Sequence, residues 1–158
     1  MLISGAISEG PKVLIVDDTG SGSEAAILDE VLPFGVASDI EGGRWWVTAV
    51  ERWREATVVQ YTVETEHTHF GVPRDRSQGP PMPQFLLAMS DDVGTYYEFS
   101  GGGCGGGSSL LSGRASFRTP IAPRASSLLV TLHQASWGSQ QTAVVLAEMS
   151  LALPLSNR

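Results

Sequence analysis

The stretch Thr57-Val58-Val59-Gln60-Tyr61-Thr62-Val63-Glu64, residues 57–64, decides the fold of this chain. In an extended backbone, Val59, Tyr61 and Val63 fall on one side. The other side carries Val58, Gln60, Thr62 and Glu64. A repeat of two between apolar positions is typical of a strand with one buried face. The stretch therefore predicts a strand of an antiparallel sheet.

The same alternation recurs between turn segments rich in Gly, Pro, Ser and Asp. It appears at Phe85/Leu87/Met89, at Leu128/Val130/Leu132 and at Ala143/Val145/Ala147/Met149. Further strands are expected at 27–36, 44–50, 96–100 and 114–119, with a hairpin loop at 52–56 and a flexible glycine-rich connection at 101–109. Counting these segments predicts an all-β antiparallel sandwich of roughly seven to nine strands.

The length of 158 residues is that of one domain, and the first part of the chain is expected to be a separate leading segment. Residues 1–26 hold a short possible strand at 12–16 and then the turn-forming residues 17–23, so they are expected to form an N-terminal extension or an edge strand. Residues 27–158 are expected to form the sandwich. A single domain of this size buries roughly 70% of the surface that its unfolded chain exposes, so it needs no disulfide or metal to fold.

The charge of the chain argues against two classes of partner. The net charge is −7, and residues 1–66 hold twelve acidic and four basic side chains. A field of that sign repels phosphate backbones and anionic membrane surfaces, so neither nucleic acid nor a membrane is expected as a partner.

The single cysteine, Cys104, cannot form an internal disulfide, which favours a reducing compartment. The first residues lack the basic stretch and the long apolar core of a signal peptide, and no apolar run is long enough to span a membrane. The expected location is therefore cytoplasmic. Cys104 lies among glycines, where an exposed, passive thiol is expected.

Two histidines are the candidates for a metal site. His67 and His69 stand two residues apart, so in an extended segment both side chains leave the same face. A metal site of this kind also needs further ligands, and His133 is the only other imidazole in the chain. The pair is therefore interpreted as two exposed residues at the end of a strand, and no metal or other cofactor is expected.

Other motifs suggest chemistry but lack the residues that complete it. Residues 12–18 resemble the first strand and acidic pair of a receiver domain, yet the chain has no second lysine and its later segments alternate as strands do. Asp91 and Asp92 suit a hairpin turn and lack the spacing of an EF-hand. Glu51 or Glu64 could serve a glycoside hydrolase on a sandwich, which is the last of the alternatives.

Tryptophans are the candidates for a binding surface. Trp45, Trp46 and Trp53 could stack a sugar or a peptide where they are exposed. Trp45 and Trp46 are adjacent, so in a strand they face opposite sides, and one of them is expected to point outward. An outward tryptophan indicates an interface.

The order of several motifs resembles that of small bacterial immunoglobulin-like β-sandwich domains. The matching segments are Val31-Leu32-Pro33, Val47 to Val63, Asp91-Asp92-Val93-Gly94-Thr95-Tyr96-Tyr97, Gly101 to Gly107, Phe117 and Leu128 to Leu132. This resemblance covers about two-thirds of the chain and excludes residues 1–26. It implies an immunoglobulin-like fold, and it brings no activity and no catalytic residues.

The expected function is non-catalytic: a protein-interaction or structural module that pairs with itself or with a protein partner through sheet edges or an aromatic patch. The alternative is a small-ligand domain, binding carbohydrate or metal, built from the loop at 67–83 and nearby tryptophans. The interaction module predicts a flat apolar patch, whereas the ligand domain predicts polar and aromatic groups around a concavity. The sequence does not distinguish these two.

Overall fold

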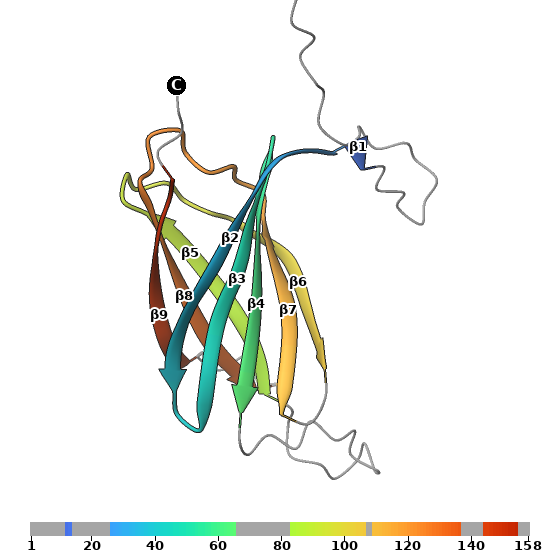
Figure 1. The fold of residues 1–158 in the computed structure, drawn as a ribbon, viewed down its shortest axis with the longest axis vertical. Coiled ribbons are helices and arrows are strands. Elements are labelled where there is room, and N and C mark those ends of the chain that lie inside the picture. The colour runs from blue at the N-terminus through green and yellow to red at the C-terminus, as the bar shows by residue number, and fades with distance from the viewer. Residues whose placement is uncertain (1–11, 14–25, 66–82, 107–108, 137–143, 155–158) are drawn as a thin grey trace, which may run out of the picture.

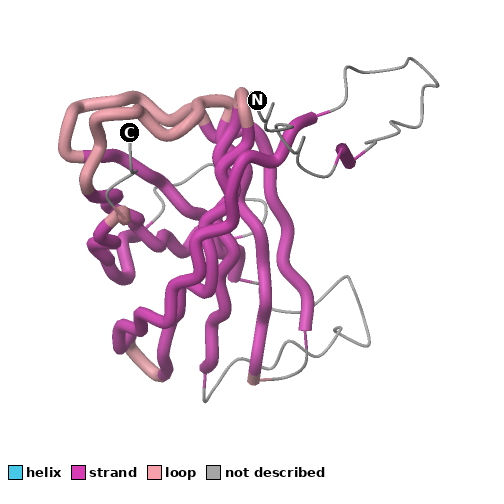
Figure 2. The backbone as a smooth tube through the Cα atoms, turned by 45° about the horizontal axis from the view of Figure 1, so that its top comes forward, coloured by secondary structure: helices cyan, strands magenta, loops and turns pink. Residues whose placement is uncertain are grey.

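The computed structural model describes residues 12–13, 26–65, 83–106, 109–136 and 144–154, and their regular structure is entirely β (Figures 1 and 2). The strands are β1 (Lys12–Val13), β2 (Ala26–Ile40), β3 (Gly43–Trp53), β4 (Ala56–Thr65), β5 (Pro83–Asp91), β6 (Phe99–Gly106), β7 (Leu110–Phe117), β8 (Ser127–Ser136) and β9 (Val144–Ala152). These ranges contain no helix. The prediction of an all-β chain of about seven to nine strands is therefore confirmed.

The strands form two sheets in which every neighbouring pair is antiparallel. The six-stranded sheet has the order β1-β2-β3-β4-β7-β6, and the three-stranded sheet has the order β5-β8-β9. The two sheets pack against each other, with β9 lying beside β2 (Figure 1). The antiparallel two-sheet arrangement predicted from the alternation is thus the one the structure has.

The core lies between the sheets and is built from the alternating residues of the predicted strands. Val59, Tyr61 and Val63 are at most 4% exposed. The other buried members of the predicted runs are Phe85, Leu87, Met89, Leu128, Val130 and Leu132. Because their apolar surface is removed from water, these side chains supply the main favourable term in folding.

The last predicted run departs from the expected pattern. Val145 is 53% exposed, although the alternation placed it on the buried face with Met149. The pairing of β8 with β9 shifts register between Leu132 and His133. A slip of one residue moves a side chain to the other face of its sheet, so the inward position predicted for Val145 is wrong.

The hairpin between β3 and β4 is tighter than predicted. The sequence suggested a loop over residues 52–56, but β3 continues to Trp53, which pairs directly with Ala56. The neighbouring strand β2 runs alongside, and the Arg54 N–H donates to the Ile27 carbonyl at 2.9 Å. Because β2 holds this end in the sheet, only Arg54 and Glu55 remain for the turn.

The glycine-rich segment is a strand, which corrects the prediction of a flexible connection. β6 runs from Phe99 to Gly106 and pairs with β7. The strand predicted over 96–100 overlaps it only at Phe99 and Ser100. Two of the glycines are required by this pairing. A Cβ atom on Gly102 would lie 2.5 Å from the Arg114 carbonyl oxygen, and one on Gly106 would lie 2.0 Å from the Leu110 carbonyl oxygen.

A carboxylate fixes the connection between β5 and β6. Asp91 Oδ1 accepts from the Val93 and Thr95 N–H groups at 3.1 and 2.8 Å, and Asp91 Oδ2 accepts from the Tyr97 hydroxyl at 2.9 Å. Burial alone would raise the pKa of Asp91, but the hydrogen bonds from Thr95, Tyr97 and Val93 outweigh it and hold the pKa below 3.8. The Asp91 carboxylate therefore has a structural role in this turn.

Replacing Asp91 by alanine is expected to lower the free energy of unfolding by about 2 kcal/mol, because the Tyr97 hydroxyl, on a residue only 5% exposed, loses its acceptor. Folding lowers the pKa of Asp91. The stability that its carboxylate contributes is therefore fully present above the unfolded-state pKa of 3.8, and it is lost as the pH falls through the pKa of the folded state. Urea denaturation at several acid pH values measures both effects. An equal pH dependence in the variant and the parent would contradict this role.

Candidate functional site

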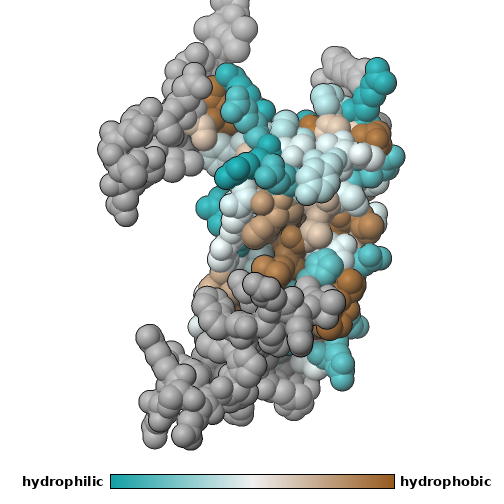
Figure 3. Space-filling view, turned by 180° about the vertical axis from the view of Figure 1, so that it is seen from behind, coloured by the Kyte–Doolittle hydropathy of each residue, from teal (hydrophilic) through white to brown (hydrophobic). Residues whose placement is uncertain are grey.

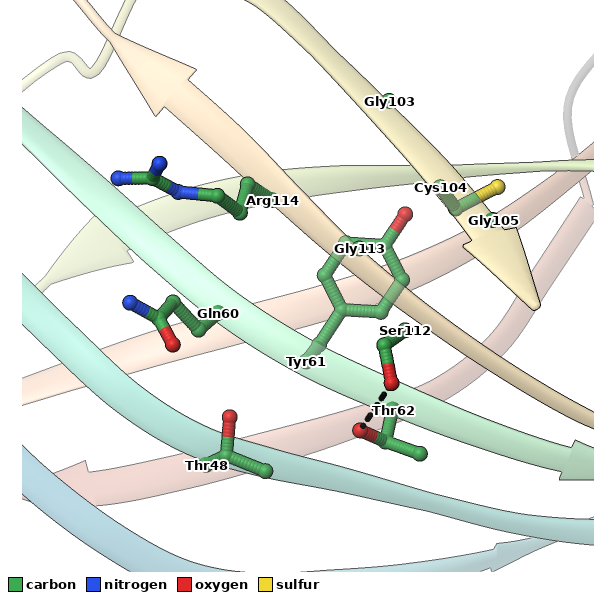
Figure 4. A pocket seen from close by; sticks show the side chains of 10 residues that line it. All are labelled: Thr48, Gln60, Tyr61, Thr62, Gly103, Cys104, Gly105, Ser112, Gly113 and Arg114. Atoms are coloured by element: carbon green, nitrogen blue, oxygen red, sulfur yellow. Dashed lines mark hydrogen bonds between the residues drawn. The ribbon is translucent and has the colours of Figure 1, made fainter.

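A shallow groove of about 680 Å³ lies on the outer face of the six-stranded sheet (Figure 4). Its polar side chains come from two cross-strand rows, Gln60–Arg114–Gly103 and Thr62–Ser112–Gly105. Exposed Thr48, at the register shift of β3, adds a further hydroxyl. Both rows end in glycine on β6, and the row between them, Tyr61, Gly113 and Cys104, also lines the groove.

A buried carboxylate holds the charged end of the groove. Glu51 is 7% exposed, and its two oxygens accept hydrogen bonds from Trp53 Nε1 at 2.9 Å, from Gln60 Nε2, and from Arg114 Nη2 at 2.7 and 2.9 Å. The Arg114 side chain is 58% exposed. Bonds between ionised partners are the stronger kind, so Glu51 fixes the position of the guanidinium at the surface of the sheet.

The groove offers hydroxyl, amide and guanidinium groups, which suit hydrogen bonding to a polar ligand. The carboxylates Glu51 and Glu64 do not form a hydrolase pair. Glu51 lies opposite Val58 on β4. Val58 is six residues before Glu64 on the same strand, so Glu51 and Glu64 are about 20 Å apart along the strand direction. Glycosidase carboxyl groups lie about 5–9.5 Å apart. Within the described ranges, no three His, Cys, Asp or Glu residues cluster as metal ligands would.

Tyr61, Gly113 and Cys104 form the row between those of the groove, and the alternation of the strands turns it to the inner face. The Tyr61 ring lies over Gly113, where a Cβ atom would be 2.5 Å from Tyr61 Cζ. Burial, and then the neighbouring Cys104 thiol, raises the pKa of Tyr61 to about 12. Tyr61 therefore stays protonated at neutral pH and cannot act as a base for the exposed Cys104.

The open edge of the six-stranded sheet is β6. The sheet order ends with this strand, so no described strand pairs with its second side. In an antiparallel edge strand, about half of the backbone N–H and C=O groups point away from the sheet. All but one of the residues of β6 are exposed, and its sequence, Phe-Ser-Gly-Gly-Gly-Cys-Gly-Gly, has neither charge nor proline.

A second exposed surface lies on the outer face of the three-stranded sheet. Figure 3 shows apolar side chains gathered on the side of the molecule away from the viewer of Figure 1. Leu129 on β8 and Val145 on β9 are 38% and 53% exposed. This surface is apolar, but none of its features indicates a particular partner.

The three tryptophans predicted to bind a ligand do not form one site. Trp45 is completely buried in the core, whereas Trp46 and Trp53 are half-buried on the outer face, and the Trp53 indole donates to Glu51. The adjacent tryptophans thus face opposite sides, as predicted. His67, His69 and the rest of the loop up to residue 82 lie outside the described residues.

Sequence reasoning missed the link between Glu51 and Arg114 and the strand character of β6. The register shift between Val47 and Ala49 turns Glu51 to the outer face, and the pairing of β4 with β7 brings it to Arg114. Neither feature has a local signature in the sequence. For β6, the available signal was the absence of charge and proline from residues 99–106. That signal identifies an edge only once the pairing with β7 is known.

A solved structure has a similar fold, whereas the comparisons of sequence found no match. No family model matches it, and no curated protein matches it significantly. A solved structure, the crystal structure of the conserved domain protein from Bacillus anthracis, is similar with a TM-score of 0.54 and 19% identity. The match covers 79% of this chain and 49% of the other, so this chain spans about half of that protein. Identity this low shows the fold alone.

The described residues also contain no helix with the length and apolarity needed to cross a membrane.

Proposed function

We propose that this chain is a non-catalytic protein-interaction module that adds a partner strand to the free edge of β6. The observation that carries the proposal is a strand of eight residues, seven of them exposed, with no charge or proline along it and no described strand paired to its outer side. An added strand gains affinity from main-chain hydrogen bonds. Such edges are normally protected, because they are templates for pairing with another chain.

The other edge strands of the two sheets carry protecting features that β6 lacks. β1 has Lys12, β5 begins with Pro83 and ends with Asp91, and β9 contains Glu148. β2 carries Pro33 and three acidic residues, Asp29, Glu30 and Asp39; β1 pairs with two of its residues, and β9 lies beside it. Charged side chains and proline discourage edge pairing. β6 is therefore the described edge that is best suited to accept a strand.

The edge is tested by placing lysines on it. A variant with Gly103→Lys and Gly105→Lys should fold normally, because a Cβ atom at either position would meet nothing within 4 Å. It should weaken association at least about tenfold, because charged side chains now flank the backbone that a partner must approach. Light scattering over a range of concentrations detects association between copies, and a pull-down with parent and variant baits detects other partners.

The matched control places the same two charges on the other sheet, as Ser90→Lys and Ser150→Lys, both at exposed positions. This control should associate like the parent. If the β6 variant and the control behave identically in both measurements, the edge is not the interaction site. Association lost only in the β6 variant supports it.

The groove supports a second candidate function, small-ligand binding. Gln60, Thr62, Ser112 and Arg114 surround it, and Trp46 lies beside Thr62 on the same face. Aromatic and hydrogen-bonding side chains together suit a carbohydrate. This function predicts that Trp46 fluorescence changes when soluble oligosaccharides are titrated, and that Arg114→Ala removes the change. The same titration with zinc and with EDTA covers the metal alternative.

Two finer assignments belong to the same proposal. An immunoglobulin-like arrangement is supported by the resemblance of the motifs and by the two antiparallel sheets. A cytoplasmic location is supported by the single, exposed cysteine, which forms no internal disulfide.

A further inference from the structure

The central residues of β6 read the same in both directions. Residues 102–106 are Gly-Gly-Cys-Gly-Gly, with Cys104 at the centre. We infer that the partner strand is the β6 of a second copy of this chain, paired antiparallel about a two-fold axis at Cys104. This inference rests on the proposed function and specifies its partner and register.

Two-fold symmetry favours this partner. In an interface between two identical copies, the same surface is used twice and must complement itself. With Cys104 opposite Cys104 of the second copy, Gly102 faces Gly106 and Gly103 faces Gly105, so every pair beside the cysteines joins two glycines. No charges oppose each other along this edge, although each chain carries a net charge of −7. The acidic edge of β2, paired with itself, would bring like charges together.

The fold of a single copy does not account for all the glycines of β6. Gly102 and Gly106 are required by the close approach of β7, but Cβ atoms on Gly103 and Gly105 would meet nothing within 4 Å. Glycine inside a strand is unfavourable, and it often marks the close approach of another backbone. A second β6 would supply such a backbone on the side where no described strand of the single copy pairs.

No described strand pairs with the free side of β6. β9 of the three-stranded sheet lies beside β2, toward the opposite end of the strand order from β6. Pairing at β6 would join the two six-stranded sheets into one continuous sheet. Residues directly opposite in an antiparallel pair have Cα atoms about 4.5–5.5 Å apart and point to the same face. This separation lies within the range of a disulfide.

The first test is cross-linking of the parent protein at Cys104. Diamide is the oxidant: it takes up the two protons and two electrons that two thiols release as their S–S bond forms. On a non-reducing gel, the cross-linked dimer should become the main band at concentrations where light scattering shows association. Cys104→Ser should abolish the cross-link, because this variant has no thiol left to form it.

The second test checks the register with two variants that each lack Cys104. One carries Cys104→Ser with Gly103→Cys, and the other carries Cys104→Ser with Gly105→Cys. In the inferred register, position 103 of one copy faces position 105 of the other, whereas two copies of either variant alone place their cysteines on a diagonal, about 7–8 Å apart. The mixture should therefore yield at least about tenfold more cross-linked dimer than either variant alone.

The outcomes separate this inference from the proposed function. Suppose that the lysine substitutions weaken association but neither test gives a cross-link. The inferred register is then wrong, while the edge of β6 remains the interaction site. If the protein stays monomeric, two copies do not pair. The edge of β6 then remains the proposed interaction site only if the pull-down with the parent protein captures a partner that the lysine variant does not capture. Association that survives the lysine substitutions overturns both.

Discussion

Replacing Trp45 by alanine is expected to lower the free energy of unfolding by about 3–5 kcal/mol. Trp45 is 0% exposed and belongs to the core between the two sheets, so its removal leaves a large cavity and forfeits the burial of an aromatic side chain. A loss of this size is a large part of the stability of an ordinary domain. The shift in the urea midpoint, with an unchanged slope, measures it.

The adjacent tryptophan is the matched control. Trp46 lies half-buried on the outer face of the same strand, so Trp46→Ala should cost about 1 kcal/mol or less. Because the full alanine substitution could prevent folding, Trp45→Phe provides a measurable intermediate. It removes less volume, and it also removes an indole N–H that has no hydrogen-bond partner among the described residues. Equal losses for Trp45→Ala and Trp46→Ala would contradict the inward position of Trp45.

These neighbouring tryptophans show what the sequence can predict about the fold. Because side chains alternate along a strand, the sequence predicts that Trp45 and Trp46 face opposite sides. Which of them faces the core depends on the pairing of Trp45 with Val63 on β4, whose own alternation is clear. The prediction is therefore reliable within one strand and depends on register between strands, as the outward position of Val145 shows.

The candidate site was harder to predict than the core. An apolar run reports burial through its side chains, but β6 is held in the sheet by backbone hydrogen bonds, to which glycine contributes without any side-chain pattern. Likewise, Glu51 and Arg114 are 63 residues apart and meet only because β4 joins β3 to β7. Sites assembled from long-range pairing have no local periodicity to reveal them.

The second large effect is expected at Gly113, where Gly113→Ala should lower the free energy of unfolding by about 1–3 kcal/mol. The new Cβ atom would lie 2.5 Å from Tyr61 Cζ and 2.6 Å from Tyr61 Oη, so the ring must move. Tyr61 is only 4% exposed within the core, and packed cores accommodate added volume poorly. Urea denaturation measures the loss.

The same substitution on β6 should have the opposite sign. Neither Gly113 nor Gly103 has a positive φ, so alanine is not strained by the backbone at either position. A Cβ atom on Gly103 meets nothing within 4 Å, and restricting the unfolded chain there should stabilise the fold by about 0.4–1 kcal/mol. If the Tyr61 ring causes the loss at Gly113, then in a Tyr61→Leu background Gly113→Ala should cost less than about 0.5 kcal/mol. An undiminished cost in that background would show that the loss comes from the backbone of β7 and not from Tyr61.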